Sequence, residues 1–199
     1  MGYTGFTIDL IEPHLAGVET VIDAGAQNLY NQPLIPAPYA SEWYKEKDIL
    51  YWAIDVCQEN GSFAIDLSKP QTISREIPLM VADLLVDAGT SEHVGDNGKF
   101  GWEAIYNCWL NKFNLVRVGG KIISENPKTG NWPGHGFNYY TEDFYRNLEA
   151  KSDLKILSLG EHPAMGNITD GWNIYCVMEK TGEKFPTLAE FKKLGIMQS

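Results

Sequence analysis

The amino-acid sequence predicts a single α/β domain, residues 1–199, built around a parallel sheet. Short apolar runs that end in Asp or Gly recur along the chain, and polar stretches with helical periodicity separate them. The chain contains no internal repeat, low-complexity tract or linker. A length of 199 residues is enough to form one hydrophobic core without disulfides or metal.

Five apolar runs are predicted to form the parallel strands. A short apolar run without polar alternation is typical of a buried strand. In the first run, Val21 and Ile22 are apolar, Asp23 ends the strand, and a turn follows at Gly25. The last run follows a Gly-Gly turn. The runs are ETVIDAG at 19–25, ILYWAIDV at 49–56, SFAIDL at 62–67, ADLLVDAG at 82–89 and GKIISE at 120–125.

Two helices are predicted to cover this sheet. Between 100 and 115, large apolar residues recur every three or four positions, which predicts an amphipathic helix packed on the sheet rather than a cofactor-binding stripe. These residues are Trp102, Ile105, Tyr106, Trp109, Leu110 and Phe113. A second helix is predicted over 141–148, with Thr141 as its N-cap and two acids in its first turn.

The remaining segments complete the domain. Runs at 155–159 and 172–178 predict a terminal antiparallel pair of strands, and the tail at 185–196 predicts a closing helix with Pro186 near its first position. The segment 28–43 contains three prolines and lacks a helical pattern. We expect it to form a long loop over the mouth of the sheet, either as a lid or binding segment or as a structural excursion.

The charge balance narrows the classes of ligand. The chain carries 26 acidic and 16 basic side chains, for a formal net charge of −10. Such a surface gains nothing from the counterion release that drives binding to phosphate backbones, which argues against nucleic acid and anionic membranes as partners. A small molecule, a protein or a cationic ligand fits better. The 44% of hydrophobic residues argues against disorder.

The cysteines and the N-terminal residues predict a reduced, cytoplasmic protein. The chain has three cysteines, which lie far apart and lack a CxxC spacing: Cys57, Cys108 and Cys176. An odd number without such a spacing favours free thiols that pack as small apolar groups. The first ten residues contain no basic region or sustained apolar run, and nowhere do about 18 apolar residues run together. We expect no signal peptide and no transmembrane helix.

The residues that end the predicted strands are the first candidates for a binding site. In an open α/β sheet, ligands bind outside the carboxyl ends of the strands. These ends carry Asp23, Gly25, Asp55, Asp66 and the segment 87–93. A glycine after the first strand allows close approach of backbone amides, and an acid after the second can accept hydrogen bonds from a ribose diol. The pattern suggests an adenosine-bearing cofactor, although each acid could instead cap a helix or be solvated.

The glycine pattern distinguishes between two such cofactors. A dinucleotide-binding turn requires GxGxxG so that a pyrophosphate can rest on a helix N-terminus, but AQNLY follows Gly25 here. A cofactor without phosphate does not need the later glycines. Acidic groups would repel a pyrophosphate but suit a sulfonium or an amino group, which favours S-adenosylmethionine over NAD.

Two polar loops carry candidate catalytic residues. In GTSEHV at 89–94, the Glu92 carboxylate could hold a cationic ligand and the His93 imidazole could take up a proton. Alternatively, Glu92 caps the next helix and His93 packs beneath it. In NWPGHGFNYY at 131–140, His135 lies between two glycines, which suggests either close approach to a ligand or a purely structural turn.

The histidines give no signal for a metal site. None of them has a partner at the two-residue or four-residue spacing typical of metal ligands, so we expect no bound metal. They are His14, His93, His135 and His162.

In their order, these motifs resemble those of the class I S-adenosylmethionine-dependent methyltransferases over roughly residues 20–180. The subset most similar has a GT-(S/T)-EHV string after the fourth strand. The matching segments are VIDAG at 21–25, AIDV at 53–56, AIDLSKP at 64–70, VADLLVDAGTSEHV at 81–94, VRVGGKIISENP at 116–127 and HGFNYYTEDFYRNL at 135–148.

The resemblance implies a three-layer Rossmann-like sandwich with a mostly parallel seven-stranded sheet, in the order 3-2-1-4-5-7-6 with strand 7 antiparallel. It also implies S-adenosylmethionine as cofactor. His93 and then His135 would face the methyl acceptor as the catalytic residues. The implied cofactor-binding residues are Asp23, Gly25, Ala26 and Gln27 at the methionine end, Asp55 and Val56 at the ribose, Asp66 and Leu67 at the adenine, and Ala88, Gly89 and Glu92 near them.

Three functions follow as hypotheses. The leading one is methyl transfer to a small-molecule, sugar-like or peptide acceptor. Because Gln27 and Leu29 stand where the family usually has glycines, the second is a non-catalytic methyltransferase-like binding module. The third, a nicotinamide-dependent oxidoreductase, shares the second-strand acid but lacks the phosphate-binding turn.

Part of the negative charge is expected at the mouth of the sheet, where a positively charged cofactor would lie. Six acids occur within the first four predicted strands, at their ends or in the turn that follows. They are Asp23, Asp55, Asp66, Asp83, Asp87 and Glu92.

Overall fold

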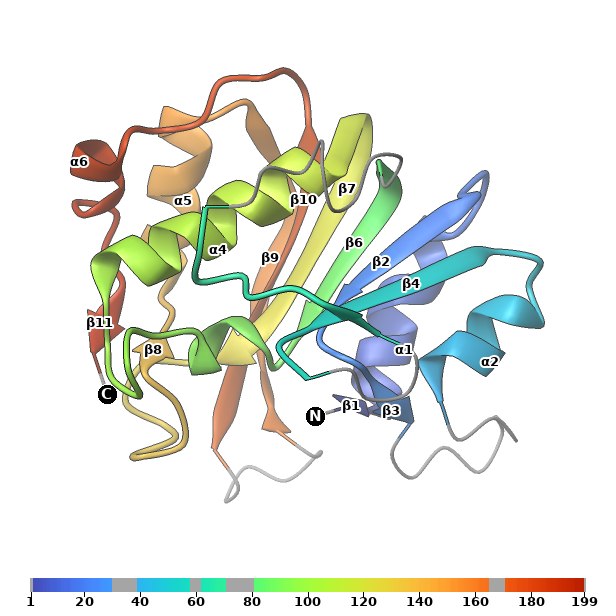
Figure 1. Cartoon of the computed structure of the whole chain (residues 1–199), viewed down its shortest axis with the longest axis horizontal. Coiled ribbons are helices and arrows are strands. Elements are labelled where there is room, and N and C mark those ends of the chain that lie inside the picture. The colour runs from blue at the N-terminus through green and yellow to red at the C-terminus, as the bar shows by residue number, and fades with distance from the viewer. Residues whose placement is uncertain (1, 30–38, 58–61, 71–80, 165–170, 199) are drawn as a thin grey trace.

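The computed structural model describes residues 2–29, 39–57, 62–70, 81–164 and 171–198, which fold around one seven-stranded sheet (Figure 1). Six strands run in the same direction, and β10 runs antiparallel to both of its neighbours. This confirms the predicted order and the antiparallel seventh strand. Across the sheet the strands are β5 (Phe63–Ala64), β4 (Leu50–Asp55), β2 (Thr20–Ala24), β6 (Ala82–Ala88), β7 (Val116–Pro127), β10 (Trp172–Lys180) and β9 (Leu154–Pro163).

Helices cover both faces of the sheet and create three layers. The helices α4 (Trp102–Leu115), α5 (Glu142–Lys151) and α6 (Leu188–Phe191) pack on one face, and α1 (Gly5–Ile11) and α2 (Ala40–Lys45) pack on the other (Figure 1). Successive strand residues point to opposite faces. In β2, Ile22 therefore joins the core beneath α4, and Val21 joins the core beneath α1 and α2.

The predicted helix with the aromatic stripe is α4. Ile105, Trp109 and Phe113 are fully or almost fully buried against the sheet, so the stripe belongs to the core as expected. The helix α5 begins where Thr141 accepts a hydrogen bond from the Phe144 amide at 3.1 Å, which confirms the predicted N-cap. This helix continues three residues beyond the predicted end.

Several predicted boundaries were wrong. The third strand is reduced to the two residues of β5, and the fifth begins at Val116 rather than at 120. The closing helix predicted over 185–196 contains only α6, because Thr187 rather than Pro186 starts it through a capping box with Glu190.

The chain then reverses at Gly195, whose φ of +97° is in the left-handed region. Beyond it, β11 (Met197–Gln198) pairs antiparallel with β8 (Asn138–Tyr139). The tail thus ends as a short strand rather than as a helix.

The proline-containing segment is more ordered than predicted at both of its ends. Its first residues form β3 (Asn28–Leu29), which pairs in parallel with β1 (Gly2–Tyr3), and α2 begins at Ala40. Residues 30–38, on which the lid hypothesis depends, lie outside the described residues. A short 3-10 turn, η1 (Glu12–His14), follows α1. Within the described ranges, no helix is long and apolar enough to span a membrane.

Candidate active site

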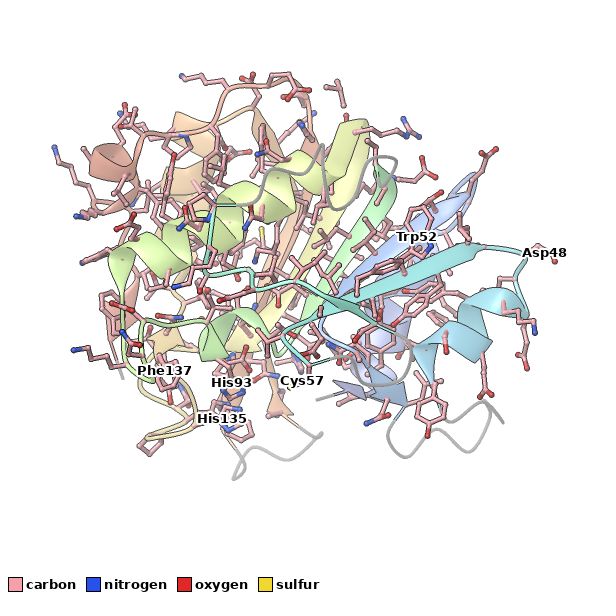
Figure 2. The ribbon with its side chains drawn as sticks, viewed as in Figure 1. Asp48, Trp52, Cys57, His93, His135 and Phe137 are labelled. Carbon is pink, nitrogen blue, oxygen red and sulfur yellow. The ribbon has the colours of Figure 1, made fainter. Side chains whose placement is uncertain are left out.

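The carboxyl ends of the parallel strands meet at one edge of the sheet. Figure 2 shows Cys57, His93 and His135 at this lower edge, whereas Asp48 lies near the opposite end of β4. Ligands of open parallel sheets bind at such an edge. Two cavities open there, and they divide most of the predicted site residues between them.

The first cavity has a volume of about 320 Å³ and lies beyond β4 and β5. It gathers residues from three separate stretches of sequence, 54–56, 65–69 and 90–97. Ile54, Ile65 and Leu67 provide apolar surface beside carboxylates, which suits an aromatic base attached to a hydroxylated ring. The predicted site residues that line it are Asp55, Val56, Asp66, Leu67 and His93.

Asp55 is held in place by two backbone amides. Its Oδ2 accepts a hydrogen bond from the Ala26 amide at 3.0 Å, and its Oδ1 accepts one from the Cys57 amide at 3.2 Å. A carboxylate has about four acceptor positions, so capacity for two further donors remains. The side chain is half-buried and is therefore fixed but accessible.

The turn after β2 is closely packed by its own side chains. Gly25 has a φ of +92°, and a Cβ at this position would collide with the Thr90 hydroxyl. The buried Gln27 side chain donates from Nε2 to the Ala24 carbonyl at 3.2 Å. Its Oε1 is buried and has no hydrogen-bond partner among the described residues.

Asp23, at the end of β2, is fully buried and has no basic partner in the described part of the chain. The Tyr3 hydroxyl donates to its Oδ1, and the Tyr51 hydroxyl donates to its Oδ2 at 2.8 Å. Burial raises the pKa of Asp23 to about 8, in opposition to these two hydrogen bonds and with a small contribution from Asp87. Tyr44 completes the surrounding hydroxyl cluster, 3.1 Å from the Tyr3 hydroxyl.

Asp87, at the end of β6, is equally buried but is paired with a cation. Lys112 on α4 is also fully buried, and its Nζ lies 2.6 Å from Asp87 Oδ2 and 2.7 Å from the Ser91 hydroxyl. Burial alone would raise the pKa of Asp87, but the Lys112 ammonium and the Ser91 hydrogen bonds hold it below its usual range. This network anchors the 3-10 helix η2 (Ser91–His93) to the sheet.

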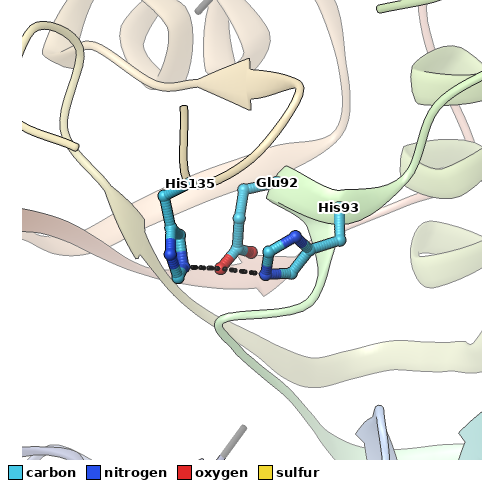
Figure 3. A group of neighbouring side chains, drawn as sticks. All are labelled: Glu92, His93 and His135. Atoms are coloured by element: carbon cyan, nitrogen blue, oxygen red, sulfur yellow. Dashed lines mark ion pairs between the residues drawn. The ribbon is translucent and has the colours of Figure 1, made fainter. Parts of the chain in front are cut away.

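The second cavity, of about 180 Å³, lies beyond β6 and β7. Among its lining residues are the predicted Ala88, Gly89, Glu92 and His135. Glu92 is 1% exposed, and burial raises its pKa to about 7. Figure 3 shows its carboxylate between two imidazoles, with Oε1 3.5 Å from His93 Nε2 and 3.8 Å from His135 Nε2. The structural alternative predicted for this pair does not occur, since Glu92 caps neither η2 nor α4 and His93 is partly exposed.

Comparison with known proteins identifies the fold. No family model and no curated protein matches the sequence. The solved structures that it matches include 1,6-didemethyltoxoflavin N1-methyltransferase of Burkholderia thailandensis bound to 1,6-didemethyltoxoflavin and S-adenosylhomocysteine, at 14% identity and a TM-score of 0.60, covering 87% of this chain and 76% of that chain. The chain has the class I methyltransferase fold.

Two further structures support the same assignment. The N-methyltransferase NodS of Bradyrhizobium japonicum matches at 14% identity and a TM-score of 0.55, covering 90% of this chain and 93% of that chain. An S-adenosylmethionine-dependent methyltransferase of Archaeoglobus fulgidus matches at 14% identity and a TM-score of 0.55, covering 87% of this chain and 91% of that chain. At such identities the likeness shows the fold alone.

On this methyltransferase fold, the predicted residues form two groups. Those near the first cavity come from the end of β4, the turn after β5 and η2, and those near the second come from the end of β6, η2 and the loop after β7. The first-strand residues are not among the described residues that line either cavity. These are Asp23, Gly25, Ala26 and Gln27.

Sequence reasoning missed Glu125, a buried acid at the end of β7 that lines the second cavity. It accepts hydrogen bonds from the Thr7 hydroxyl at 2.7 Å and from Asn173 Nδ2 at 3.2 Å, and its Oε1 lies 3.0 Å from His162 Nε2. The ring of Phe6 stacks on His162 with centroids 3.6 Å apart. Acids at the ends of the first three predicted strands are candidate site residues by the sequence criterion. Glu125 is the last residue of the fifth predicted run, so the same criterion applied there would have found it.

Asp83 was wrongly included among the acids at the mouth. It lies at the start of β6, where its carboxylate accepts hydrogen bonds from the Glu19 and Thr20 amides, each at 2.8 Å. It also pairs with Arg117. The prediction failed because it counted any acid within a strand run and did not separate the start of the strand from its end. The contacts of Asp83 make it a structural residue at the edge opposite the site.

Proposed function

We propose that this chain is an S-adenosylmethionine-dependent methyltransferase that acts on a small-molecule acceptor. The observation that carries the proposal is the first cavity, where Asp55, Asp66 and Leu67 come together with His93 at the carboxyl edge of the sheet. The fold adds support, because solved structures that share it hold S-adenosylhomocysteine.

The residues present fit the nucleoside half of this cofactor. Asp55 retains acceptor positions for the two ribose hydroxyls after its backbone contacts are counted. Ile65 and Leu67 would flank the adenine ring, and Asp66 would accept hydrogen bonds at the rim. Each charge-assisted hydrogen bond of this kind contributes about 1.5–3 kcal/mol.

The methionine half also has a matching group, although the turn is closely packed. The buried Gln27 Oε1 lacks a donor among the described residues, and an ammonium group would supply one. The neighbouring Asp23 carboxyl would become ionised as positive charge arrives. Gln27 would thus supply this contact from a position where the family usually has a glycine.

The bound cofactor supplies an electrophilic methyl group, and the chain positions the acceptor and removes its proton. The second cavity, which Ala88 and Gly89 help to line, would hold the acceptor. His135 lines this cavity and His93 lines the first cavity beside it. Both would face the acceptor, and an imidazole nitrogen can accept a proton from a hydroxyl or an amine. Catalysis in this arrangement depends mainly on orientation and exclusion of water.

The second cavity favours a small, uncharged or cationic acceptor. Its volume of about 180 Å³ suits a small ring or a single inserted group of a larger sugar or peptide. Two buried carboxylates, Glu92 and Glu125, line it and would repel an anionic acceptor. An amine or a hydroxyl group is both small and free of negative charge.

A non-catalytic binding module is the second candidate, and the packing of Gln27 and Thr90 around Gly25 favours it. In that case the nucleoside half of the ligand would bind and turnover would be absent. A nicotinamide-dependent oxidoreductase has no comparable support, because no glycine-rich phosphate turn follows β2.

Calorimetric titration with S-adenosylmethionine, S-adenosylhomocysteine and NADH tests the proposal. We expect the first two to bind and NADH not to bind. Asp55→Ala should weaken binding at least tenfold, because it removes charge-assisted hydrogen bonds to the ribose. Asp9→Ala, an exposed acid on α1, is the matched control. If neither adenosyl ligand binds, both the methyltransferase hypothesis and the binding-module hypothesis are overturned.

Turnover separates the two candidates. The chain should produce S-adenosylhomocysteine from S-adenosylmethionine in the presence of a panel of small amines and hydroxyl compounds. His93→Ala should suppress this product while S-adenosylhomocysteine binds nearly as before. Cofactor binding without any product across the panel would favour the module, and unchanged turnover in His93→Ala would remove this residue from the mechanism.

A further inference from the structure

Three potential metal ligands converge between the two cavities. Glu92 and His93 come from η2, and His135 comes from the loop after β7. One oxygen or nitrogen atom from each side chain lies within 4.8 Å of the other two, and the two imidazole rings have centroids 5.0 Å apart. His93 and His135 are far apart in sequence, which is why their spacing gave no signal.

The distances suit a metal ion better than direct hydrogen bonds. Glu92 Oε1 is 3.5 Å from His93 Nε2 and 3.8 Å from His135 Nε2, and both exceed the usual hydrogen-bond range of about 2.7–3.2 Å. Ligand atoms that each lie about 2.1 Å from a tetrahedral metal ion are roughly 3.4 Å apart. Small side-chain rotations would therefore bring all three atoms to one ion.

The carboxylate between the imidazoles also lacks sufficient partners for its burial. Glu92 is 1% exposed, and within the described ranges no donor forms a hydrogen bond with its Oε2. A buried charged group without compensation is costly, and a cation would supply that compensation. The exposed fractions of His93 and His135, 36% and 42%, leave a path for an ion and a ligand to enter.

The two segments that carry these side chains are fixed to each other by hydrogen bonds to backbone carbonyls of η2. The Phe137 amide donates to the Glu92 carbonyl at 2.7 Å, and Asn138 Nδ2 donates to the Ser91 carbonyl at 3.0 Å. Gly136 permits this approach, because a Cβ there would lie 2.7 Å from the Glu92 carbonyl oxygen. The site is therefore organised before any ion binds, which lowers the entropic cost of binding.

We propose that Glu92, His93 and His135 bind one divalent transition-metal ion. Two imidazoles and one carboxylate favour Zn²⁺, Fe²⁺ or Co²⁺ over Mg²⁺ or Ca²⁺, which prefer oxygen ligands. Three protein ligands leave coordination positions open toward the second cavity. Resting on the proposed function, this ion would hold an oxygen or nitrogen atom of the acceptor. His93 and His135 would then position the acceptor as metal ligands instead of accepting its proton.

Titration of the metal-free chain with Co²⁺ tests the site directly, since its absorption spectrum reports the ligands. The protein should be prepared without a histidine tag. It should also contain the Cys57→Ser substitution, because Cys57 is an exposed thiol that could bind metal. We expect one equivalent to bind, with Zn²⁺ displacing it and Mg²⁺ failing to do so. His135→Ala and His93→Ala should each weaken binding at least tenfold.

His14→Ala, in η1 after α1, is the control and should leave the affinity unchanged. His135 is exposed, so its replacement is not expected to disturb folding, and retained S-adenosylhomocysteine binding would show this. Absence of Co²⁺ binding, or equal binding by the wild type and both histidine variants, would overturn the metal site. Metal binding without adenosyl-ligand binding would instead overturn only the proposed function.

Discussion

Asp23 and Asp87 end neighbouring strands, and both are fully buried, yet their charge states differ. Asp87 has Lys112 at 2.6 Å, which holds the pKa of its carboxyl low and keeps it ionised. Asp23 has tyrosine hydroxyls but no cation among the described residues, and burial raises its pKa to about 8. One position is a permanent ion pair, and the other is a carboxyl that stays protonated near neutral pH.

This difference gives the two aspartates different roles, because Asp87 anchors η2 and Asp23 would respond to a bound ligand. The Asp87–Lys112 pair fixes η2, and with it Glu92 and His93, whether or not a ligand is bound. Asp23 lies beside the turn that we assign to the methionine half of the cofactor. There an arriving positive charge would stabilise the ionised carboxylate, so that Asp23 would gain its charge only with the ligand.

The largest expected effect comes from breaking the buried pair. Lys112→Met should lower the free energy of unfolding by about 3–5 kcal/mol, because Asp87 would remain as an uncompensated buried charge. Urea denaturation measures this loss. The double variant Asp87→Asn with Lys112→Met should recover most of it, and a loss below about 1 kcal/mol in the single variant would contradict the anchoring role.

The second prediction concerns the pH dependence of stability through Asp23. An aspartate ionises near pH 4 in the unfolded chain and near pH 8 in the fold, so the folded state binds more protons between these values. Stability should therefore fall as pH rises through this window, by at most about 1.4 kcal/mol per pH unit.

Asp23→Asn should remove this fall, as measured by urea denaturation at a series of pH values between 4 and 8. The exposed Asp9→Asn variant should keep the wild-type slope. An Asp23→Asn profile parallel to that of the wild type would show that Asp23 is ionised in the fold.

The third prediction links Asp23 to the proposed cofactor. Near pH 7, binding of S-adenosylmethionine should release up to about one proton, since the ligand's positive charge favours the ionised carboxylate. Calorimetry in buffers of different ionisation enthalpy counts this proton. Asp23→Asn should bind without release. Equal proton release by both proteins would assign the proton to another group.

The smallest expected effect comes from removing one hydrogen bond to Asp23. Tyr51→Phe deletes the donor at 2.8 Å and should raise the pKa of Asp23 further, at a cost of about 0.5–1.5 kcal/mol to the ionised form. The upper end of the stability profile should shift to higher pH. Tyr106→Phe on α4 is the control and should leave it in place.

The strands and helices near the site were largely predictable because they follow from local patterns. Buried runs ending at Asp23 and Asp55 predicted β2 and β4, and the stripe around Trp109 predicted α4. The tail was not predictable in this way. A capping box at Thr187 and a left-handed residue at Gly195 outweighed a weak apolar pattern that had suggested a continuous helix.

The candidate site was predictable only as a set of residues. Strand-end positions and motif order selected Asp55, Asp66 and Glu92 before their arrangement was known. Partners from distant segments did not follow, such as Thr7 for Glu125, because no local pattern relates residues that far apart.

By itself, the sequence determined most of the side chains that reach the carboxyl edge, because strand length, period and the residues that end a strand are local properties. The tertiary structure decided what those side chains can do. It paired Asp87 with Lys112, left Asp23 among hydroxyls, and brought His135 to Glu92. Charge state and ligand geometry depend on burial and on contacts between distant segments, and only the folded chain establishes these.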